Sequence, residues 1–341
     1  MPILFPLAAT LAFTTAASAV PNYGHDFVTI GNVNNPAYQA TFPDTIYDGR
    51  GSVSYEYRIA SREMDSGQYI EFANALNSAR IPGLQASQAA RGGFSAGIDP
   101  DTGLIVFFAL SDESVNWPVR GMNWRLSAVY CNWLHNDKGS DPEDFLSGAY
   151  DYASFGSSGA EFTDQATRSP GAKYWIPSTD EWLKAVHYDP DKEGPGVGGW
   201  WDYSNGSDAR PVTGLPGEGE TSANIAAQIG RQAAWQIPVG AYADHTTPYG
   251  LLDASGGVSE WMEDWVFPND PTDRFYDGHA SEDFLYGTFD VDHVAIPRGS
   301  RSPGSAPDYL GIRIAAAVPA PGTVVALLVV LGGISGIRRR R

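Results

Sequence analysis

Cysteine is nearly absent from this chain, since Cys131 is the only one among its 341 residues. An intrachain disulfide and a dithiol redox pair are therefore both excluded. Basic side chains are also scarce, with 22 Lys and Arg against 40 Asp and Glu. Four of the basic residues are Arg338 to Arg341, so residues 20–337 carry 18 basic and 40 acidic side chains, a net charge of −22. Such a surface repels phosphate backbones, which argues against a nucleic-acid-binding protein.

Charged side chains are missing from residues 1–19, an apolar stretch that closes on Ala17-Ser18-Ala19. This pattern predicts a secretory signal peptide over residues 1–19, although its n-region lacks Lys and Arg. At the other end, residues 323–337 are apolar and lead into the four arginines. As a helix this run is shorter than a hydrocarbon core of roughly 30 Å, and snorkelling arginines would extend its reach. We therefore expect export, with a short transmembrane segment at 323–337 and the domain facing outward.

Local capping patterns predict three helices. Asp65 is followed by Gln68 three residues later, and Ser178 by Glu181, so each pair forms a capping box in front of an apolar periodic run. A further helix is expected to begin near Asn123. These helices give the chain its predicted α component.

Strands are predicted at residues 26–32 and 52–60, where apolar and polar side chains alternate. Long glycine-rich segments separate the regular elements, at residues 83–103, 138–172 and 190–222. Segments of this length within one domain carry function or pack as ordered coil. Without an internal repeat or an evident linker, we expect one domain over about residues 22–317, with an irregular α+β fold and little regular secondary structure.

Seven motifs follow one another along residues 26–315: YEYRIASREMDSGQYIEFANALN, PVRGMNWRLSAVYCNWLHND, YWIPSTDEWLKAV, SANIAAQ, VGAYADHTTPYGLLDASGGVSEWMEDW, PRGS and LGIRIA. In this order they resemble the formylglycine-generating-enzyme family, also called the sulfatase-modifying-factor domain. The resemblance implies a C-type-lectin-like α+β fold. It also places five tryptophans of these motifs in an aromatic core, namely Trp133, Trp175, Trp182, Trp261 and Trp265.

The end of the chain resembles a PEP-CTERM sorting signal over residues 318–341. Its expected Pro-Glu-Pro is replaced by Pro319-Ala320-Pro321, which lacks the glutamate. The likeness implies processing by an exosortase-type enzyme in a bacterium. It also implies a place at the cell surface or in the extracellular matrix, with attachment to the membrane through the C-terminus at least for a time.

The resemblance bears on catalysis through cysteine. Formylglycine-generating enzymes oxidise a substrate cysteine with two copper-binding cysteines, and the matching stretch here, residues 297–315, contains none. Cys131 lies far upstream in an expected helix, where it serves as a small core residue. Since a Cu(I) site needs thiolate ligands, we expect neither copper nor formylglycine-generating activity. We predict no catalytic residue.

A second branch of this fold holds non-haem iron with histidines, which leaves a metal-dependent oxidoreductase as the alternative function. His245, His279 and His293 could converge in space, although their spacing matches no metal-ligand pattern. His135 and His187 are expected at the ends of helices, where an imidazole meets the negative end of the dipole.

The resemblance also implies a calcium site in the stretch DASGGVSEW, because calcium takes carboxylate and carbonyl oxygens held by a glycine turn. The matching ligands are Asp253, Gly256, Val258 and Glu260. A capped turn with Glu260 bonded to backbone is the structural alternative. Glu263 and Asp264 are expected to be solvated or paired at the end of a strand.

A second calcium site of the family matches Asn224 and Ile225, but its downstream acidic ligand falls at Arg231 or Gln232. Outside these motifs, Trp200 and Trp201 lie in a glycine-rich loop. There they could either bind a sugar or peptide as exposed anchors or pack against the domain.

Taken together, the sequence predicts an exported surface or matrix protein whose calcium-stabilised domain is non-catalytic and binds an extracellular glycan or protein. A purely structural matrix component is a third alternative.

Overall fold

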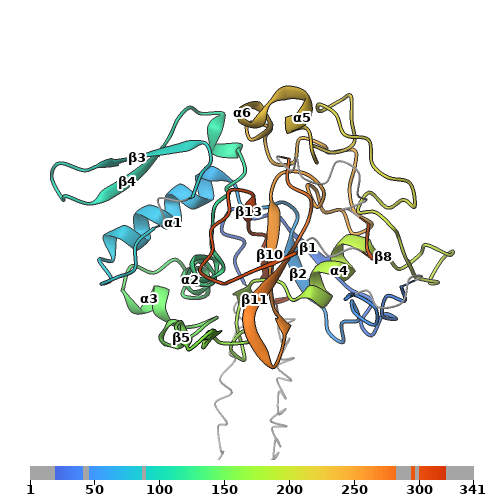
Figure 1. The fold of residues 1–341 in the computed structure, drawn as a ribbon, viewed down its shortest axis with the longest axis horizontal. Coiled ribbons are helices and arrows are strands. Elements are labelled where there is room, and N and C mark those ends of the chain that lie inside the picture. The colour runs from blue at the N-terminus through green and yellow to red at the C-terminus, as the bar shows by residue number, and fades with distance from the viewer. Residues whose placement is uncertain (1–19, 41–45, 87–89, 282–292, 296–298, 320–341) are drawn as a thin grey trace, which may run out of the picture. The chain divides into compact units, whose positions relative to one another are not determined.

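The computed structural model describes residues 20–40, 46–86, 90–281, 293–295 and 299–319 (Figure 1). In these ranges, Asn22–Val318 form one compact unit of short strands and helices joined by long ordered coil. The predicted signal peptide and the predicted transmembrane segment lie outside the described residues. None of the helices inside them has the length and apolar character to cross a bilayer.

One four-stranded sheet joins the two ends of the domain. Its order is β1 (Phe27–Ile30), β2 (Tyr57–Ala60), β14 (Ala315–Ala316) and β7 (Tyr174–Trp175), with every neighbouring pair antiparallel. The predicted strand at 52–60 is therefore shorter than expected. The reason is local, since Val53 bonds through its N–H and C=O to Asn35 and Asn34 and not to β1.

The second sheet has the order β12 (Gly299–Arg301), β11 (Asp270–Asp277), β10 (Ser259–Phe267) and β13 (Leu310–Gly311). β10 pairs with β13 in parallel, and the other pairs are antiparallel. The first five residues of β10 are buried on both faces of the strand. This central position gives β10 its run of buried acidic and aromatic side chains.

All three predicted helices are confirmed. α1 (Ser66–Ser78) and α4 (Thr179–His187) each begin with the predicted capping box, and α2 (Trp124–His135) begins after the Asn123 side chain, which caps it. α2 is buried on nearly all sides, and Cys131 is a buried core residue as expected. α3 (Glu143–Leu146), α5 (Ala226–Ile229) and α6 (Arg231–Ala234) are single turns.

Short hairpins form in and beside the glycine-rich segments. They are β3 (Phe94–Ile98) with β4 (Ile105–Ala109), β5 (Ser157–Ser158) with β6 (Glu161–Phe162), and β8 (Tyr188–Asp189) with β9 (Gly199–Trp200). Two 3-10 turns, η1 (Ser114–Asn116) and η2 (Tyr152–Ser154), complete the elements. The segments are thus packed coil with local pairing, and the irregular α+β class is confirmed.

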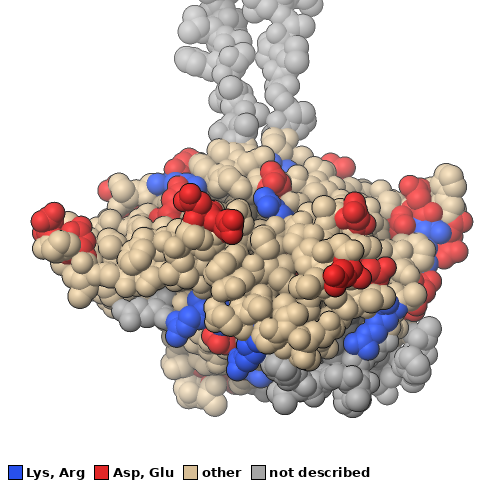
Figure 2. All heavy atoms as spheres, turned by 90° about the horizontal axis from the view of Figure 1, so that it is seen from above, with Lys and Arg blue, Asp and Glu red and all other residues tan. Residues whose placement is uncertain are grey.

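The core is aromatic. All five tryptophans that were assigned to it are buried. Arg274 is also buried, and its guanidinium carbon lies 3.7 Å from the ring centroid of Trp124 and 3.7 Å from that of Trp265. Other acidic side chains lie at the surface in several separate groups on the face that Figure 2 shows.

Candidate functional site

The loop before β10 is a tight turn around a buried carboxylate. Asp253 has a left-handed backbone with φ 57°, and Gly256 and Gly257 follow at φ 104° and 58°. A Cβ at Gly257 would lie 2.0 Å from a carboxylate oxygen of Glu63. The two glycines are therefore required by backbone conformation and by the close approach of Glu63.

Glu63 contacts this loop, although the sequence did not identify it as a site residue. Its Oε2 accepts the Val258 N–H at 2.9 Å, while its buried Oε1 has no hydrogen-bond partner among the described residues. Burial, with the nearby charges of Asp253 and Glu260, raises its pKa well above the usual range. No local signal could reveal this contact, because Glu63 and Val258 are 195 positions apart.

Glu260 faces an arginine. Both of its carboxylate oxygens accept from Arg313 Nε, at 2.9 and 3.0 Å, and Oε2 also accepts from Trp182 Nε1 at 2.7 Å. The two charged side chains are 0–1% exposed. Arg313 reaches further and donates to the carbonyls of Ala60 and Leu252. Glu260 is therefore neutralised by the protein itself.

The fit of a cation to this loop rests on the other two carboxylates. Burial raises the pKa of Asp253 to about 6, and Asp253 accepts one backbone N–H, from Gly240. Burial therefore disfavours the charged forms of both Asp253 and Glu63, and a bound cation would stabilise them. Carboxylate and carbonyl oxygens around a glycine turn are the donor set that calcium prefers. The donor types of this loop thus match those that calcium takes, although among the described residues no three His, Cys, Asp or Glu side chains are placed together to hold a metal ion.

The second predicted calcium position also offers an oxygen. Asn224 has a left-handed backbone with φ 62°, and its buried Oδ1 has no hydrogen-bond partner in the described part of the chain. The neighbouring Ile225 is fully buried. The single-turn helix α6 follows and begins at Arg231, where an acidic ligand would be needed.

The structure separates the histidines that were considered for iron. His279 is buried, and His293 lies beside Asp202, with Nε2 3.5 Å from a carboxylate oxygen. Across the described ranges, no group of three or more His, Cys, Asp or Glu side chains is placed to hold a metal ion. His187 ends α4 as expected, but burial lowers its pKa to about 3, so it is neutral there.

Neither of two stretches that could carry a nucleophile has the geometry or the residues for one. Described residues 299–315 contain β12, β13 and the first residue of β14, joined by coil, and hold no thiol. Residues 93–97 read Gly-Phe-Ser-Ala-Gly, a match to the Gly-x-Ser-x-Gly pattern. Ser95 lies within β3 of a hairpin, however, and not at the strand-to-helix turn that makes such a serine a nucleophile.

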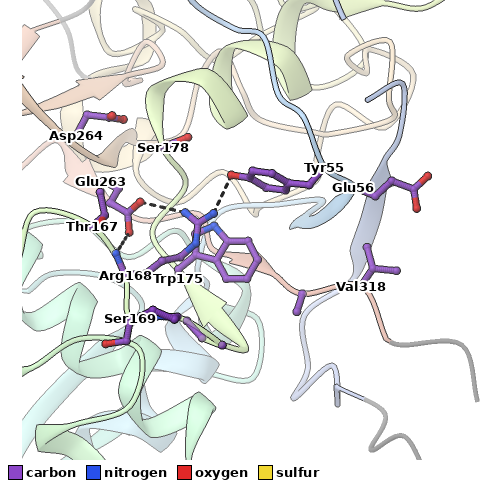
Figure 3. A pocket seen from close by; sticks show the side chains of 14 residues that line it. Tyr55, Glu56, Thr167, Arg168, Ser169, Trp175, Ser178, Glu263, Asp264 and Val318 are labelled. Atoms are coloured by element: carbon purple, nitrogen blue, oxygen red, sulfur yellow. Dashed lines mark hydrogen bonds and ion pairs between the residues drawn. The ribbon is translucent and has the colours of Figure 1, made fainter. Parts of the chain in front are cut away.

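A cavity of about 700 Å³ is lined by charged and aromatic side chains (Figure 3). Tyr55 comes from the coil before β2, Arg168 from the coil before β7, and Trp175 from β7 itself. Glu263 and Asp264 come from β10, so the two sheets both contribute to the cavity.

Arg168 is the centre of this cavity, which we call the Arg168 pocket. Its guanidinium carbon lies 4.2 Å from the ring centroid of Trp175. One terminal nitrogen donates to Glu181 at 2.9 Å and to the Tyr55 hydroxyl at 2.8 Å, and the other donates to Glu263 at 3.0 Å. These contacts fix the guanidinium plane before any ligand arrives.

The sequence left open whether Glu263 and Asp264 are solvated or paired, and in the structure both are paired. Glu263 is 2% exposed, lies in the middle of β10, and accepts from the Tyr150 hydroxyl and the Arg168 N–H. Burial raises its pKa to about 7, although the charge of Arg168 acts in the opposite direction. Asp264 accepts the Thr179 N–H at the start of α4. The pocket therefore contains a carboxyl group that titrates near neutral pH.

Trp200 and Trp201 lie away from the Arg168 pocket. Trp200 packs edge-on against Tyr38 and Tyr188, with ring centroids 5.8 and 5.3 Å away. The ring of Trp201 lies 4.2 Å from the Lys192 ammonium. Both tryptophans are half-buried and held by neighbours of the domain.

Comparison with solved structures finds the same fold in two proteins of low identity. The structure of CarF matches at 17% identity over 87% of this chain and 99% of that one, with a TM-score of 0.51. Treponema denticola variable protein 1 matches at 16% identity over 85% of this chain and 94% of that one, with a TM-score of 0.50. Curated protein sequences include no match. The sulfatase-modifying factor enzyme 1-like domain matches residues 52–318, and the chain therefore belongs to that family.

Proposed function

We propose that this chain is an exported protein of the cell surface or matrix whose domain binds an extracellular glycan in the Arg168 pocket without catalysis. The observation that carries the proposal is the pocket itself. Its guanidinium and carboxylates are fixed by mutual hydrogen bonds, and Tyr55 is 43% exposed at its edge.

Sugars suit such a site because they offer hydroxyls to polar groups and C–H faces to aromatic rings. A fixed guanidinium donates, a fixed carboxylate accepts, and an exposed tyrosine supplies an apolar face. Since Arg168 is held in place by Glu181, Glu263 and Tyr55, little side-chain entropy is lost on binding. A bound protein segment is the other occupant that the sequence allows, and the test below separates the two.

A glycan array, followed by titration calorimetry with the best ligand, tests this proposal. We expect Y55A to weaken binding about tenfold, equivalent to about 1.4 kcal/mol of lost contact. The matched control is F108A, which removes another half-exposed aromatic ring outside the pocket. The proposal fails if no glycan binds, or if Y55A and F108A bind equally well.

We further propose that calcium stabilises the loop before β10. Asp253, Glu260 and the carbonyls of Gly256 and Val258 would hold the ion, with Glu260 shared between the ion and Arg313. Support comes from the buried carboxylates and the glycine turn described above. A second ion at Asn224 and Ile225 is proposed on the unpartnered Asn224 oxygen.

Melting curves in calcium and in chelator test the first ion. At a calcium concentration about 100 times the dissociation constant, the folded state gains about 2.7 kcal/mol. This gain should disappear in D253N and persist in D99N, which changes an exposed acidic turn. A wild-type melting temperature that does not respond to calcium would refute the proposal.

The non-catalytic assignment rests on thiol chemistry. Cys131, the only cysteine, is buried in α2, and burial raises its pKa well above the usual range. Metal analysis of purified protein separates this function from the non-haem iron oxidoreductase, because stoichiometric iron or copper would overturn it. Export, exosortase-type processing and membrane attachment rest on residues 1–19 and 318–341, and fractionation of the producing cell tests them.

A further inference from the structure

The hairpin of β3 and β4 projects from the body of the domain above α1 (Figure 1). Among the residues that the structure describes, no strand pairs with the outer edge of β3. The β3 sequence, Phe-Ser-Ala-Gly-Ile, contains neither a charge nor a proline, which are the usual protections of an edge strand. Ile98 on this strand is 73% exposed. An unprotected edge of this kind is a template for pairing with another strand.

The hydrogen-bond ladder shows which backbone groups face the open edge. Asp99 donates to the Leu104 carbonyl within the hairpin, so the odd-numbered positions of β3 bond to β4. The even-numbered positions have their N–H and C=O groups on the other side. Those positions are Phe94, Ala96 and Ile98.

A groove of about 450 Å³ runs beside this edge. Residues 94–98 line it together with Ile105 and Phe107 of β4. In the register of the hairpin, Ile98 faces Ile105 and Ala96 faces Phe107, so these side chains lie on one face of the sheet. These side chains give the groove an apolar strip along the strand, and Arg91 and Ser95 add polar groups to its lining.

The two ends of the groove differ in charge. Arg91 lies at one end, and its backbone pairs with that of Arg120. Asp99 and Asp101 lie at the tip of the hairpin, at the other end. A strand that pairs antiparallel and carries the same charges would place acid against base at both ends. This complementarity favours a second copy of the same hairpin as the occupant.

We propose that two copies of this chain pair antiparallel through the edges of β3, with Ala96 at the two-fold axis. Phe94 of each copy then faces Ile98 of the other, and the outward backbone groups of both strands bond to each other. The basic end of each groove meets the acidic tip of the other copy. The result is a symmetric, isologous contact that joins two hairpins into one four-stranded sheet. This dimer is independent of the Arg168 pocket and of calcium.

Sedimentation of the full-length protein at increasing concentration tests the pairing by charge reversal. We expect R91E and D101K each to weaken dimerisation about tenfold, because the two-fold axis repeats each exposed ion pair and the reversed charge then repels its partner twice. The double variant R91E/D101K restores the complementarity and should dimerise like the wild type. All variants share the same termini, so differences between them report on β3.

Cross-linking supplies a second measurement. Cys131 is buried, so the introduced cysteine is the accessible thiol of the A96C variant. In the proposed dimer, the Cα atoms of the two copies of residue 96 would lie about 5.5 Å apart. A short thiol-reactive cross-linker should therefore give dimers with A96C. F108C, on the opposite face of the same hairpin, is the control and should give few. The proposal is overturned if the protein stays monomeric at every concentration, or if A96C and F108C cross-link equally. Pairing with a strand of a different protein would then be the remaining use of this edge.

Discussion

Replacing Arg313 by methionine is the most informative single perturbation of the domain. Methionine keeps the length of the side chain but removes its charge and its donors. Glu260 would then keep only the indole N–H of Trp182, in a site where both partners are at most 1% exposed. The carbonyls of Ala60 and Leu252 would lose the donors that reach them from Arg313.

The expected loss of stability can be estimated from these contacts. Removing one partner of a buried ion pair costs about 3–5 kcal/mol, because the other charge stays buried and unpaired. The two orphaned carbonyls raise this by about 1 kcal/mol each. A total of about 5–7 kcal/mol is comparable with the whole stability of many domains, about 5–15 kcal/mol. R313M is therefore expected to be partly or wholly unfolded.

Urea denaturation in chelator measures the effect without a bound cation that could compensate. The double variant E260Q/R313M removes the stranded charge and should be more stable than R313M alone, which shows the coupling of the two residues. The control is R62M, which breaks the exposed pair of Arg62 and Asp26 and should cost less than about 1 kcal/mol. If R313M loses no more stability than R62M, the buried ion pair does not have the role argued here.

Three further predictions concern Glu263, Gly93 and Cys131. Burial raises the pKa of Glu263 from 4.5 to about 7, so the free energy of unfolding should fall by about 3 kcal/mol as pH rises through that range. Urea denaturation at low and high pH should show this fall in the wild type and not in E263Q. A Cβ at Gly93 would lie 1.8 Å from the Ser114 carbonyl oxygen, so G93A should lower the melting temperature sharply, while G304A, with open space around it, should not. A thiol reagent should label Cys131 only after unfolding, since the thiol is buried and its pKa is raised; rapid labelling of the native protein would contradict this.

The parts of the fold that were predictable are those encoded by neighbouring residues. The capping boxes at Asp65 and Ser178 need only four consecutive positions, and both form as predicted. β7 and β14 are two residues long, too short to show any alternation, and they exist because distant segments bring them together. Local sequence patterns thus set where the helices form, whereas contacts between distant segments set where these short strands form.

The sites follow the same division. The turn around Asp253 was predicted because one continuous motif resembles the family's calcium loop, whereas the Arg168 pocket gathers Tyr55, Arg168 and Glu263 from three separate parts of the chain. Glu263 also shows why alternation misleads at a central strand. β10 is buried on both faces, so a charged residue in it reads as solvent-facing until its partner Arg168 is known.

The place of β14 in the first sheet has a consequence for the timing of folding. Ala315 pairs with both Ile59 and Trp175, so the strand that completes this sheet is made about last. At about 5–20 residues per second, a ribosome delivers it roughly 10–50 s after Ile59. Until then β2 lacks one neighbour and keeps an open edge. This sheet is therefore complete only once β14 has been synthesised, and a nascent chain that stops before Ala315 remains a substrate for chaperones and proteases.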